Sequence, residues 1–457
     1  MSGQLRSPNA TGVTPDHSVR AAGPAAISAL REWVGPAILS VVAAANVAVW
    51  LVAHPAGEPS GRYAGELFGV EALLLFSCSL VLATLLAPIE RAFGGLDRVA
   101  VWHRRVAVAG LALLVGHLAL VTSPQDPYAT SFGHALGDVA LGGLLFLSLW
   151  ALAPRLRAAR WPGPVRKLAR ASYERWLTAH RLTGLFVAVA VTHGAIVDPS
   201  LRRSSLLRVT FIAIGVTGVG AYLYRELLAR YVVAIHDYTV RAVEHVAPTV
   251  LAIQMEPARQ ALRFAPGQFV VVAFGGYDGW QRHPFSVSSP PSQRELEITI
   301  KAGGDYTGKL LERLRPGVPA KVAGPFGEFD YRRGGDHQVW IAGGIGVTPF
   351  LSWIRGIEEA LDRDVHFFYS VADAGDALHR AEIDAAAAAH HSLHVHYVYS
   401  ATDGLLTAER VMGALPAGAS PWIYICGPPA MIRSLAKGFR RCGIPGRHIR
   451  SEDFGAR

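Results

Sequence analysis

The sequence predicts a multidomain membrane protein, in which a six-helix transmembrane bundle is followed by an antiparallel β-barrel domain and an α/β domain with a parallel sheet. Three observations predict this order. Only 17% of the 457 residues are charged and 51% are hydrophobic, whereas an average soluble domain has roughly 25% charged residues. Apolar runs long enough to cross about 30 Å of hydrocarbon recur through the first half and stop near residue 231. The second half then changes from short alternating segments to apolar strands that alternate with helical stretches.

These changes divide the chain into four expected parts. They are a disordered cytoplasmic tail at 1–33, a transmembrane domain at 34–230, a barrel domain at 231–333 and a nucleotide-binding domain at 334–457. The tail lacks the charged start, apolar run and cleavage site of a signal peptide. The three cysteines are odd in number and far apart, which excludes a disulfide framework and a four-cysteine metal cluster.

The predicted membrane spans are 34–53, 67–87, 104–122, 135–153, 178–197 and 206–225. The loops after the second and fourth spans are rich in basic residues, among them Arg91, Arg98, Arg166 and Lys167. Basic loops stay on the cytoplasmic side, so we expect an integral protein of the cell membrane with both termini in the cytoplasm. The net charge of +9 then belongs mostly to these loops, which argues against a nucleic-acid partner.

Four histidines inside the predicted spans form two pairs. His103 and His117 are fourteen residues apart on the third span, and His180 and His193 are thirteen apart on the fifth. At a rise of 1.5 Å per residue each pair is separated by about 20 Å, so the four lie at two levels of the bilayer. Two histidines at one level can ligate both axial positions of a haem iron. We therefore expect His103 with His180 to bind an inner haem, and His117 with His193 an outer haem.

The fifth span has a geometric difficulty. A step of thirteen residues misses the same face of an ideal helix by about 140°, so we expect a local distortion there or rings of different orientation. The alternative is that these histidines make polar contacts between helices. Ionisable residues in spanning helices are costly, however, which favours a functional role.

The barrel region carries three short motifs. They are Pro266-Gly267-Gln268-Phe269, Arg282-His283-Pro284-Phe285-Ser286, and the segment from Lys301 through Gly303 and Gly304 to Thr307. The last has a cation, a glycine pair and a hydroxyl, which could hold a pyrophosphate through backbone N–H groups and charge. Each of the first two motifs by itself also fits an ordinary strand edge.

A glycine-rich turn follows an apolar strand in the last domain. It contains Gly343, Gly344, Gly346, Thr348 and Pro349 and opens a predicted helix. The glycines permit close approach of a phosphate, which the helix N-terminus attracts. The turn departs from the dinucleotide fingerprint, because a proline stands where the third glycine would be. A second turn, Cys426-Gly427-Pro428, follows another buried strand.

In this order the motifs resemble the ferredoxin–NADP reductase superfamily, and with the paired histidines the chain from about residue 34 resembles the ferric reductase and NADPH oxidase family. The resemblance implies FAD and NAD(P)H as cofactors besides two b-type haems. It implies FAD contacts at Gly267, Gln268, Arg282, His283, Pro284, Phe285, Ser286, Lys301, Gly304 and Thr307. It implies nicotinamide contacts at Gly343, Gly344, Gly346, Thr348, Pro349, Cys426, Gly427 and Pro428.

The resemblance also implies one catalytic residue, Phe454, as the C-terminal aromatic that covers the flavin and must move for hydride transfer. Three residues follow it here, which is a departure from the family pattern. Relatives often have an arginine after the strand that ends at Tyr369-Ser370, whereas this chain continues with Val371-Ala372-Asp373. Arg380 could take the place of that arginine, so NADH and NADPH both stay open.

The implied function is electron transfer from cytoplasmic NAD(P)H through FAD and the two haems to a small acceptor on the outer side. That acceptor is a ferric chelate, or O2 with superoxide as the product. Three alternatives remain: a haem-free membrane anchor for a flavin reductase, a channel or transporter, and an electron donor to an extracytoplasmic protein partner.

Overall fold

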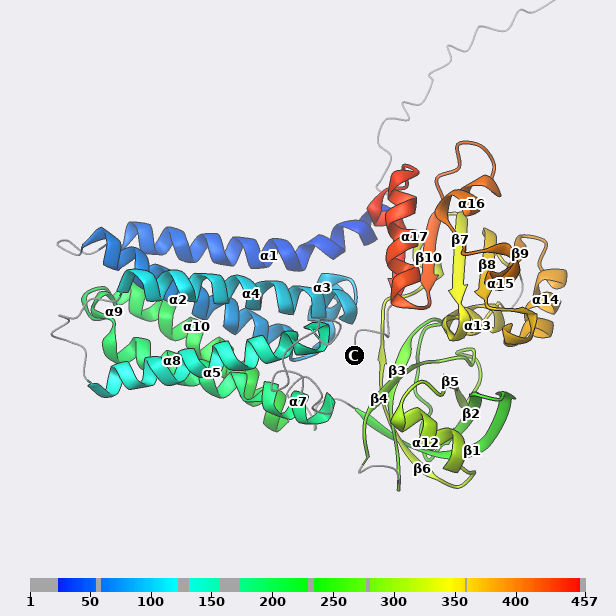
Figure 1. Cartoon of the computed structure of the whole chain (residues 1–457), viewed down its shortest axis with the longest axis horizontal. Coiled ribbons are helices and arrows are strands. Elements are labelled where there is room, and N and C mark those ends of the chain that lie inside the picture. Colours follow the sequence, from blue (N-terminus) through cyan, green and yellow to red (C-terminus); the bar gives the residue numbers. More distant parts are fainter. Residues whose placement is uncertain are drawn as a thin grey trace, which may run out of the picture.

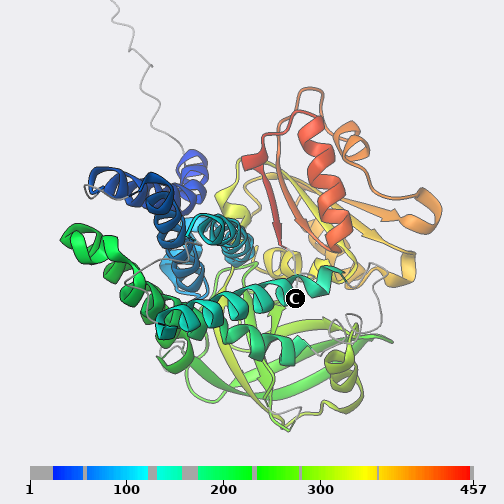
Figure 2. The ribbon, with the colours of Figure 1, turned by 60° about the vertical axis from the view of Figure 1, so that its left-hand side comes forward.

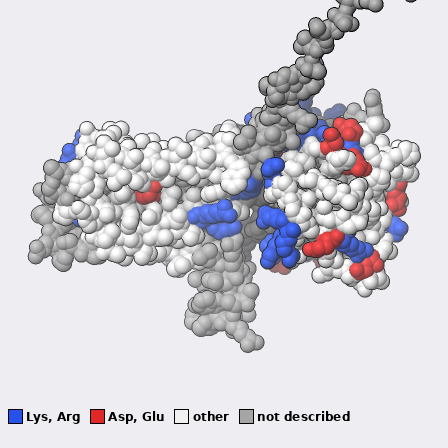
Figure 3. Space-filling view, turned by 90° about the horizontal axis from the view of Figure 1, so that it is seen from above, with Lys and Arg blue, Asp and Glu red and all other residues white. Residues whose placement is uncertain are grey.

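The computed structural model describes residues 24–54, 59–121, 131–156, 173–228, 234–276, 280–357 and 360–452. They form a bundle of long helices and two β-containing domains, and the domains meet one end of the bundle (Figures 1 and 2). Lys and Arg gather at this junction, whereas the visible side of the bundle carries few charges (Figure 3). This distribution agrees with basic loops on the side of the two domains.

Six helical segments of the described chain are long and apolar enough to cross a membrane. They are α1 (Pro24–Val52), α2 (Ser60–Leu82), α4 (Leu96–Val121), α5 (Ser131–Leu156), α7 (Tyr173–Arg181) together with α8 (Thr183–Val197), and α10 (Ser205–Leu223). Large apolar side chains such as those of Val41, Val209 and Val216 are exposed on the bundle. Such a surface is unfavourable in water and compatible with a lipid environment.

The structure moves two predicted boundaries. The second span is helical over Ser60–Leu82 and not over 67–87, because Leu85 has a left-handed φ of 57° and Pro88 lies in the first turn of α3 (Ala87–Phe93). Proline cannot continue a helix, so the apolar run is divided between α2 and α3. Part of the predicted tail is also helical, since α1 begins at Pro24, and residues 1–23 lie outside the described part of the chain.

The fifth span is locally distorted, which is one of the two possibilities that the thirteen-residue step left open. Helix α7 ends at Arg181 and α8 begins at Thr183. At the break the N–H of Leu182 bonds to the carbonyl of Ala179 at 3.0 Å, an i to i−3 contact, and the Thr183 hydroxyl donates to the carbonyl of His180 at 2.6 Å. Such contacts tighten the helix locally, so His180 and His193 need not follow the spacing of an ideal helix. The short helix α9 (Pro199–Arg203) then leads into α10.

The first β domain is a six-stranded antiparallel sheet with the order β4-β3-β6-β1-β2-β5. Its strands are β1 (Ile235–Ala247), β2 (Val250–Pro257), β3 (Phe269–Phe274), β4 (His283–Ser286), β5 (Leu296–Lys301) and β6 (Pro319–Phe326), and it carries α12 (Asp305–Arg313). The sheet curls until Val287, just after β4, forms a bridge with Ile298 of β5. The inner face buries apolar residues such as Val240 and Val272. The predicted antiparallel barrel is thereby confirmed as a curled sheet.

The second β domain is a five-stranded parallel sheet with the order β11-β10-β7-β8-β9. Its strands are β7 (His337–Gly343), β8 (Asp364–Val371), β9 (Leu393–Tyr399), β10 (Trp422–Cys426) and β11 (Ile449–Glu452). Its helices are α13 (Thr348–Arg355), α14 (Arg380–Ala389), α15 (Ser400–Asp403), α16 (Ala408–Gly413) and α17 (Pro429–Arg441). Alternate residues of β7 enter two different cores, Trp340 on one face and Ile341 on the other. Both faces are covered, which explains why these strands are almost continuously apolar.

Candidate functional site

The inner pair of histidines lies on α4 and α7, and α7 is at the end of the bundle that faces the two β domains (Figure 1). The ring centres of His103 on α4 and His180 on α7 are 6.1 Å apart, and their planes are at 84°. An iron between two imidazoles holds the ring centres about 6 Å apart, from an ~2 Å metal–nitrogen bond and ~1 Å between nitrogen and ring centre on each side. The pair therefore has the separation that axial ligation of one haem iron requires.

A hydrogen bond determines which ring nitrogen of His103 can bind a metal. Its Nδ1 lies 2.9 Å from both the carbonyl oxygen and the hydroxyl of Ser79. The carbonyl only accepts, so the tautomer with hydrogen on Nδ1 satisfies it and leaves the lone pair of Nε2 for a metal. The ring of His180 is instead stacked on Trp176, with centres 5.4 Å apart. Its Nδ1 has no hydrogen-bond partner among the described residues.

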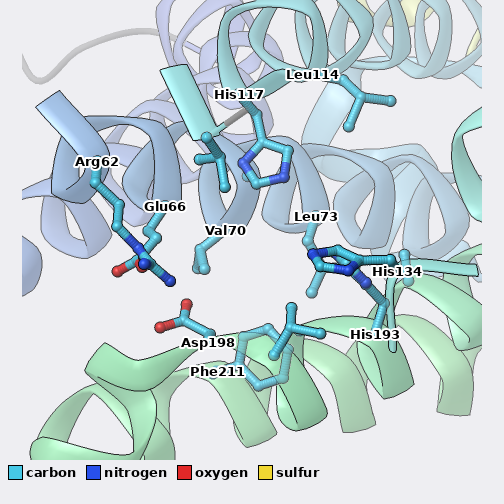
Figure 4. Close-up of a pocket in the computed structure, with 15 residues that line it drawn as sticks. Arg62, Glu66, Val70, Leu73, Leu114, His117, His134, His193, Asp198 and Phe211 are labelled. Carbon is cyan, nitrogen blue, oxygen red and sulfur yellow. The ribbon is translucent and has the colours of Figure 1, made fainter. Parts of the chain in front are cut away.

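The outer pair faces one cavity in the bundle. His117 on α4 donates from Nδ1 to the carbonyl of Gly65 on α2, and His193 on α8 donates to the carbonyl of Gly133 on α5, both at 2.8 Å. Both rings project into a cavity of the bundle that is partly open to solvent (Figure 4). Its walls include Leu73 and other apolar residues. Two oriented imidazoles that face one cavity fit the predicted outer haem.

Two glycines make room for these outer rings. A Cβ atom at Gly69 would lie 2.7 Å from Nδ1 of His117, and one at Gly137 would lie 2.7 Å from Cε1 of His193. Each stands four residues after a glycine whose carbonyl accepts the Nδ1–H bond. The carbonyl of the first glycine of each pair thus orients the ring, and the second glycine, which has no side chain, leaves space for the ring. Sequence reasoning missed them, although two G-x-x-x-G spacings in apolar segments are a recognisable signal of close helix approach.

A polar cluster borders the same cavity. Arg62 and Glu66 of α2 form an ion pair at 3.1 Å, and the hydroxyl of Ser200 donates to the other Glu66 oxygen at 2.5 Å. Asp198 lines the cavity opposite these residues and accepts the backbone N–H of Ser200 (Figure 4). Buried carboxylates in a helix bundle are costly and mark functional sites. Sequence reasoning missed this cluster because its members come from distant segments.

The structure brings two of the predicted flavin motifs together. The ring of His283 on β4 is stacked on Tyr306 of α12, with centres 3.8 Å apart and planes at 21°. Next to Tyr306, the hydroxyl of Thr307 accepts the backbone N–H groups of Gly303 and Gly304 at 3.0 and 3.2 Å. The strand predicted to contact FAD therefore lies beside the turn predicted to hold its pyrophosphate. Tyr306 is a further candidate for flavin contact.

The remaining predicted flavin residues flank these motifs. Pro284, Phe285 and Ser286 continue β4, which pairs with β3, and Arg282 directly precedes the strand. Lys301 is the exposed last residue of β5. Their contacts with FAD stay predictions.

Gly267 and Gln268 occupy a turn that is connected to the bundle. Gly267 has φ +86°, and a Cβ there would lie 2.1 Å from the carbonyl oxygen of Phe329. The Gln268 amide donates to the carbonyl of Gly327 at 3.0 Å, and the N–H of Gly327 donates to Glu90 of α3 at 2.8 Å. These hydrogen bonds give the motif a structural role at the junction with the bundle, in addition to the predicted flavin contact.

The two nicotinamide turns touch each other. Strands β7 and β10 are parallel neighbours, with Ala342 opposite Cys426, so the turns that follow them lie at the same edge of the sheet. A Cβ at Gly346 would lie 2.3 Å from the carbonyl oxygen of Cys426, and a Cβ at Gly427 would lie 3.0 Å from Cα of Gly343. Ligands bind at this edge of parallel sheets. The glycines are thus required by the close approach of the two turns, at the edge where the nucleotide is predicted to bind.

The other residues of these turns support them. Pro428 lies 2.8 Å from the position that a Cβ of Gly343 would take, and Gly344 has φ +54°. The Thr348 hydroxyl donates to the carbonyl of Ile345 at 2.7 Å at the start of α13, where Pro349 occupies the first turn. The glycine-rich turn therefore opens a helix, as predicted.

The predicted catalytic residue, Phe454, lies outside the described residues. Strand β11 ends at Glu452, which is opposite Cys426 on β10. The chain thus leaves β11 at the edge where the nicotinamide turns lie. The role of Phe454 stays a prediction.

One arginine joins the two β domains. Arg355 of α13 is 2.6 Å from Glu297 of β5, donates to the carbonyl of Ser288 at 3.0 Å, and contacts both carboxylate oxygens of Glu382 on α14 at 2.5 and 2.9 Å. Burial opposes the charge of Arg355, but the two glutamates outweigh it and raise the pKa of the guanidinium. This network holds the flavin and nicotinamide domains in one arrangement.

The residues that follow β8 bear on nicotinamide choice. Asp373 accepts the backbone N–H of Gly375 at 2.9 Å. Arg380 donates to the hydroxyl of Tyr399 at 3.1 Å and lies 3.5 Å from Asp384. The carboxylate of Asp373 is thus at the end of the strand next to β7, while Arg380 is engaged on α14 and β9.

Comparison with known proteins shows what the C-terminal half is similar to. Residues 234–331 match the model of an FAD-binding domain, and residues 340–437 match that of the oxidoreductase NAD-binding domain. The ferredoxin–NAD(P)(+) reductase component of the naphthalene 1,2-dioxygenase/salicylate 5-hydroxylase systems from Ralstonia sp is 29% identical over 229 residues, 47% of this chain and 68% of that protein. A flavohemoprotein from Burkholderia sp. is 27% identical over 208 residues, 43% of this chain and 52% of that protein.

A solved ferredoxin NADP+ reductase from Neisseria gonorrhoeae with bound FAD and NADP aligns with a TM-score of 0.43 and 21% identity, over 48% of this chain and 98% of that one. The chain spans only about half the length of the flavohemoproteins that it matches. From the two family models and the sheet topology, the C-terminal half consists of an FAD-binding domain and an oxidoreductase NAD-binding domain with a ferredoxin–NADP reductase-type fold. These two domains form an FAD- and NAD(P)-binding oxidoreductase module, which confirms this part of the resemblance.

Proposed function

We propose that the chain is a transmembrane oxidoreductase of the ferric reductase and NADPH oxidase type, which oxidises a cytoplasmic nicotinamide and reduces an acceptor on the outer side. The observation that carries the proposal is the inner histidine pair. The ring centres of His103 and His180 are 6.1 Å apart, and α3, which directly precedes the helix of His103, is bonded to the FAD domain through Glu90. A helix bundle that only anchors a reductase has no need of such a pair.

The cofactors suit this role. When bound, FAD accepts two electrons from the nicotinamide and releases them singly to b-type haems, which accept one at a time. His103 and His180 would hold one haem and His117 and His193 the other, and six-coordinate iron suits electron transfer. Arg62 supplies a cation beside the outer pair.

The chain's own residues prepare the nicotinamide end. In this proposal the charge of Lys301 holds the FAD pyrophosphate, beside the turn in which Gly303 and Gly304 donate their N–H groups to the Thr307 hydroxyl. The turns of Gly343 and Cys426 bring the nucleotide to the sheet edge. Phe454 covers the flavin in this proposal and moves aside when the nicotinamide binds.

We propose NADH as the donor. A carboxylate after the second strand of a nucleotide-binding sheet suits a ribose 2′-hydroxyl and repels a 2′-phosphate, and Asp373 is in that position. Comparing kcat/KM for NADH and NADPH tests this, and a preference for NADPH contradicts it.

For the acceptor, the charges of the cavity walls leave both candidates open. Arg62 and Glu66 form an ion pair, and burial together with the neighbouring Glu66 raises the pKa of Asp198 to about 7. The cavity walls therefore carry little net charge, which neither attracts a cation nor opposes the formation of superoxide. Of the two acceptors that the resemblance implies, ferric iron and O2, we keep both in the proposal.

Sealed vesicles with the reductase module outward provide the main test. Adding NADH should reduce a ferric acceptor trapped in the lumen. His117→Ala should abolish this and leave reduction of an external dye intact, whereas His54→Ala, at the end of α1, is the matched control. Reduction of the external dye alone, with two haems bound, would refute transfer across the membrane.

Haem content separates the alternatives. The purified protein should contain two low-spin haems, and each histidine variant should lose one. Protein without haem supports the anchored flavin reductase. Two haems that reduce neither iron nor O2 support an extracytoplasmic protein partner. Transport of a solute in the absence of nicotinamide supports a transporter.

The flavin assignment has its own test. A fragment from residue 234 onward should reduce dyes with NADH and added FAD. Failure of this fragment to reduce dyes, when it is well folded, argues against the flavin assignment.

A further inference from the structure

A cluster of histidines lies on the NAD-binding domain, away from the nicotinamide turns. Strands β7, β8 and β9 are parallel neighbours, and their registers place His337 opposite Asp364, and His366 opposite His394. Successive side chains of a strand point to opposite faces, so Asp364 and His366 share one face, as do His394 and His396 on β9. The register thus collects four imidazoles and a carboxylate on one face.

This face is covered by helices only farther along the strands. Phe368 and Val398 enter the core beneath α16 and α17. Nearer the start of the strands, His366 and His396 are half-buried and the side chain of His394 is 46% exposed. The cluster is therefore accessible from solvent, yet its strands are held rigidly by the sheet.

The distances among these side chains suit a metal ion. One ligand atom each from Asp364, His366 and His394 lies within 4.8 Å of the others. Nε2 of His394 is 3.1 Å from Oδ1 of Asp364, and Nδ1 of His366 is 3.1 Å from Nε2 of His396. Ligand atoms about 2.0–2.1 Å from a tetrahedral ion are themselves roughly 3.3 Å apart. Small side-chain rotations therefore suffice to enclose an ion.

The ligand types indicate the class of ion. Imidazole suits zinc, copper and nickel, whereas magnesium and calcium prefer sets of oxygen ligands. The carboxylate of Asp364 balances part of the charge of a divalent ion.

We propose that Asp364, His366 and His394 form a binding site for a divalent transition-metal ion, with zinc as the best fit and His396 as the fourth ligand. The ion ties the edge strand β9 to β8. The site lies at the start of these strands, whereas the nicotinamide turns follow the ends of β7 and β10. His366 is the third of the eight residues of β8, so roughly 16 Å of strand, at ~3.3 Å per residue, separates it from the end of β8. The ion therefore stabilises the domain and takes no part in electron transfer.

Zinc titration of the full-length protein tests the proposal. The protein is purified in detergent, freed of any affinity tag and washed with chelator, then titrated with ZnCl2 and, for its visible absorption, with CoCl2. We expect one ion per chain and a rise in melting temperature with zinc. His366→Ala and His394→Ala should each weaken binding roughly ten-fold or more and remove the thermal shift.

His245→Ala is the matched control, since it removes an exposed strand histidine from β1. NADH-dependent dye reduction should be unchanged in every variant, which shows that each is folded. If His366→Ala fails to fold, zinc binding by His394→Ala, which changes a more exposed residue, and by the isosteric Asp364→Asn still tests the proposed site. Wild-type protein that binds no zinc at micromolar concentration, or variants that bind it equally well, would overturn the site.

Discussion

Glu90 of α3 accepts a hydrogen bond from the backbone N–H of Gly327 at 2.8 Å, although 237 residues separate the two in the sequence. Glu90 is buried, and the carbonyl of Gly327 accepts the Gln268 amide at 3.0 Å. One residue of the FAD domain is therefore bonded both to its own flavin-motif turn and to the bundle. Helix α4, which carries His103, follows directly after α3.

This contact should control transfer from the FAD domain to the bundle. Glu90→Ala leaves the buried N–H of Gly327 without its acceptor, at a cost of about 1–3 kcal/mol. We expect NADH-driven haem reduction, followed by stopped-flow absorbance, to slow roughly ten-fold or more, while dye reduction is unchanged. Glu244→Ala, an exposed glutamate of β1, is the control. Equal rates of haem reduction in both variants would show that the contact is irrelevant to transfer.

The outer haem should depend on two glycines. Gly69→Ala and Gly137→Ala each place a Cβ 2.7 Å from an atom of an outer histidine ring, so the ring must move. We expect each variant to lose the outer haem and keep the inner one, measured as haem per chain and by redox titration. Gly61→Ala on α2 and Gly142→Ala on α5 are controls, because a Cβ there meets nothing within 4 Å. Full haem content in the first two variants would count against the outer site.

Arg355 should hold the two β domains together. Arg355→Gln leaves Glu297 buried without its cation, and breaking a buried pair costs about 3–5 kcal/mol. We expect a loss of that order in the free energy of unfolding of the fragment from residue 234. Arg241→Gln removes the exposed pair with Glu295 and should cost about 1 kcal/mol or less. Urea unfolding measures both losses of stability. Similar losses in the two variants would contradict the role of Arg355 at the interface of the two domains.

The same network predicts an acid dependence. Burial opposes the charge of Glu382, but hydrogen bonds from His379 and Arg355 outweigh it and lower its pKa from 4.5 to about 2. A carboxyl whose pKa is lower in the folded state stabilises the fold fully above pH 4.5 and loses this effect as the pH falls towards 2. Melting temperatures of the fragment across this interval should fall less steeply in Glu382→Gln than in wild type. Melting temperatures that fall equally steeply with pH in both proteins would argue against a stabilising role for the Glu382 carboxylate.

The sequence alone determined the order and class of the three parts. Hydropathy and strand periodicity are local properties, so the six spans, the antiparallel sheet and the parallel sheet were all predictable. The distortion of the fifth span was predictable as one of two possibilities, because helix geometry relates His180 to His193. The ends of the helices were harder to predict. The apolar run continues to residue 87, although α2 ends at Leu82, because that end depends on one left-handed residue and a proline.

The tertiary structure alone decided which distant residues meet. The carbonyls that orient the outer histidines, the pair of Glu90 and Gly327, and the network of Arg355 join residues that lie far apart in the sequence. The cluster of His366 and His394 depends on the register of two parallel strands. Helix packing and strand register create such contacts, and both are set by the burial of the whole core. A local pattern identifies a residue as a candidate, but only packing supplies its partner.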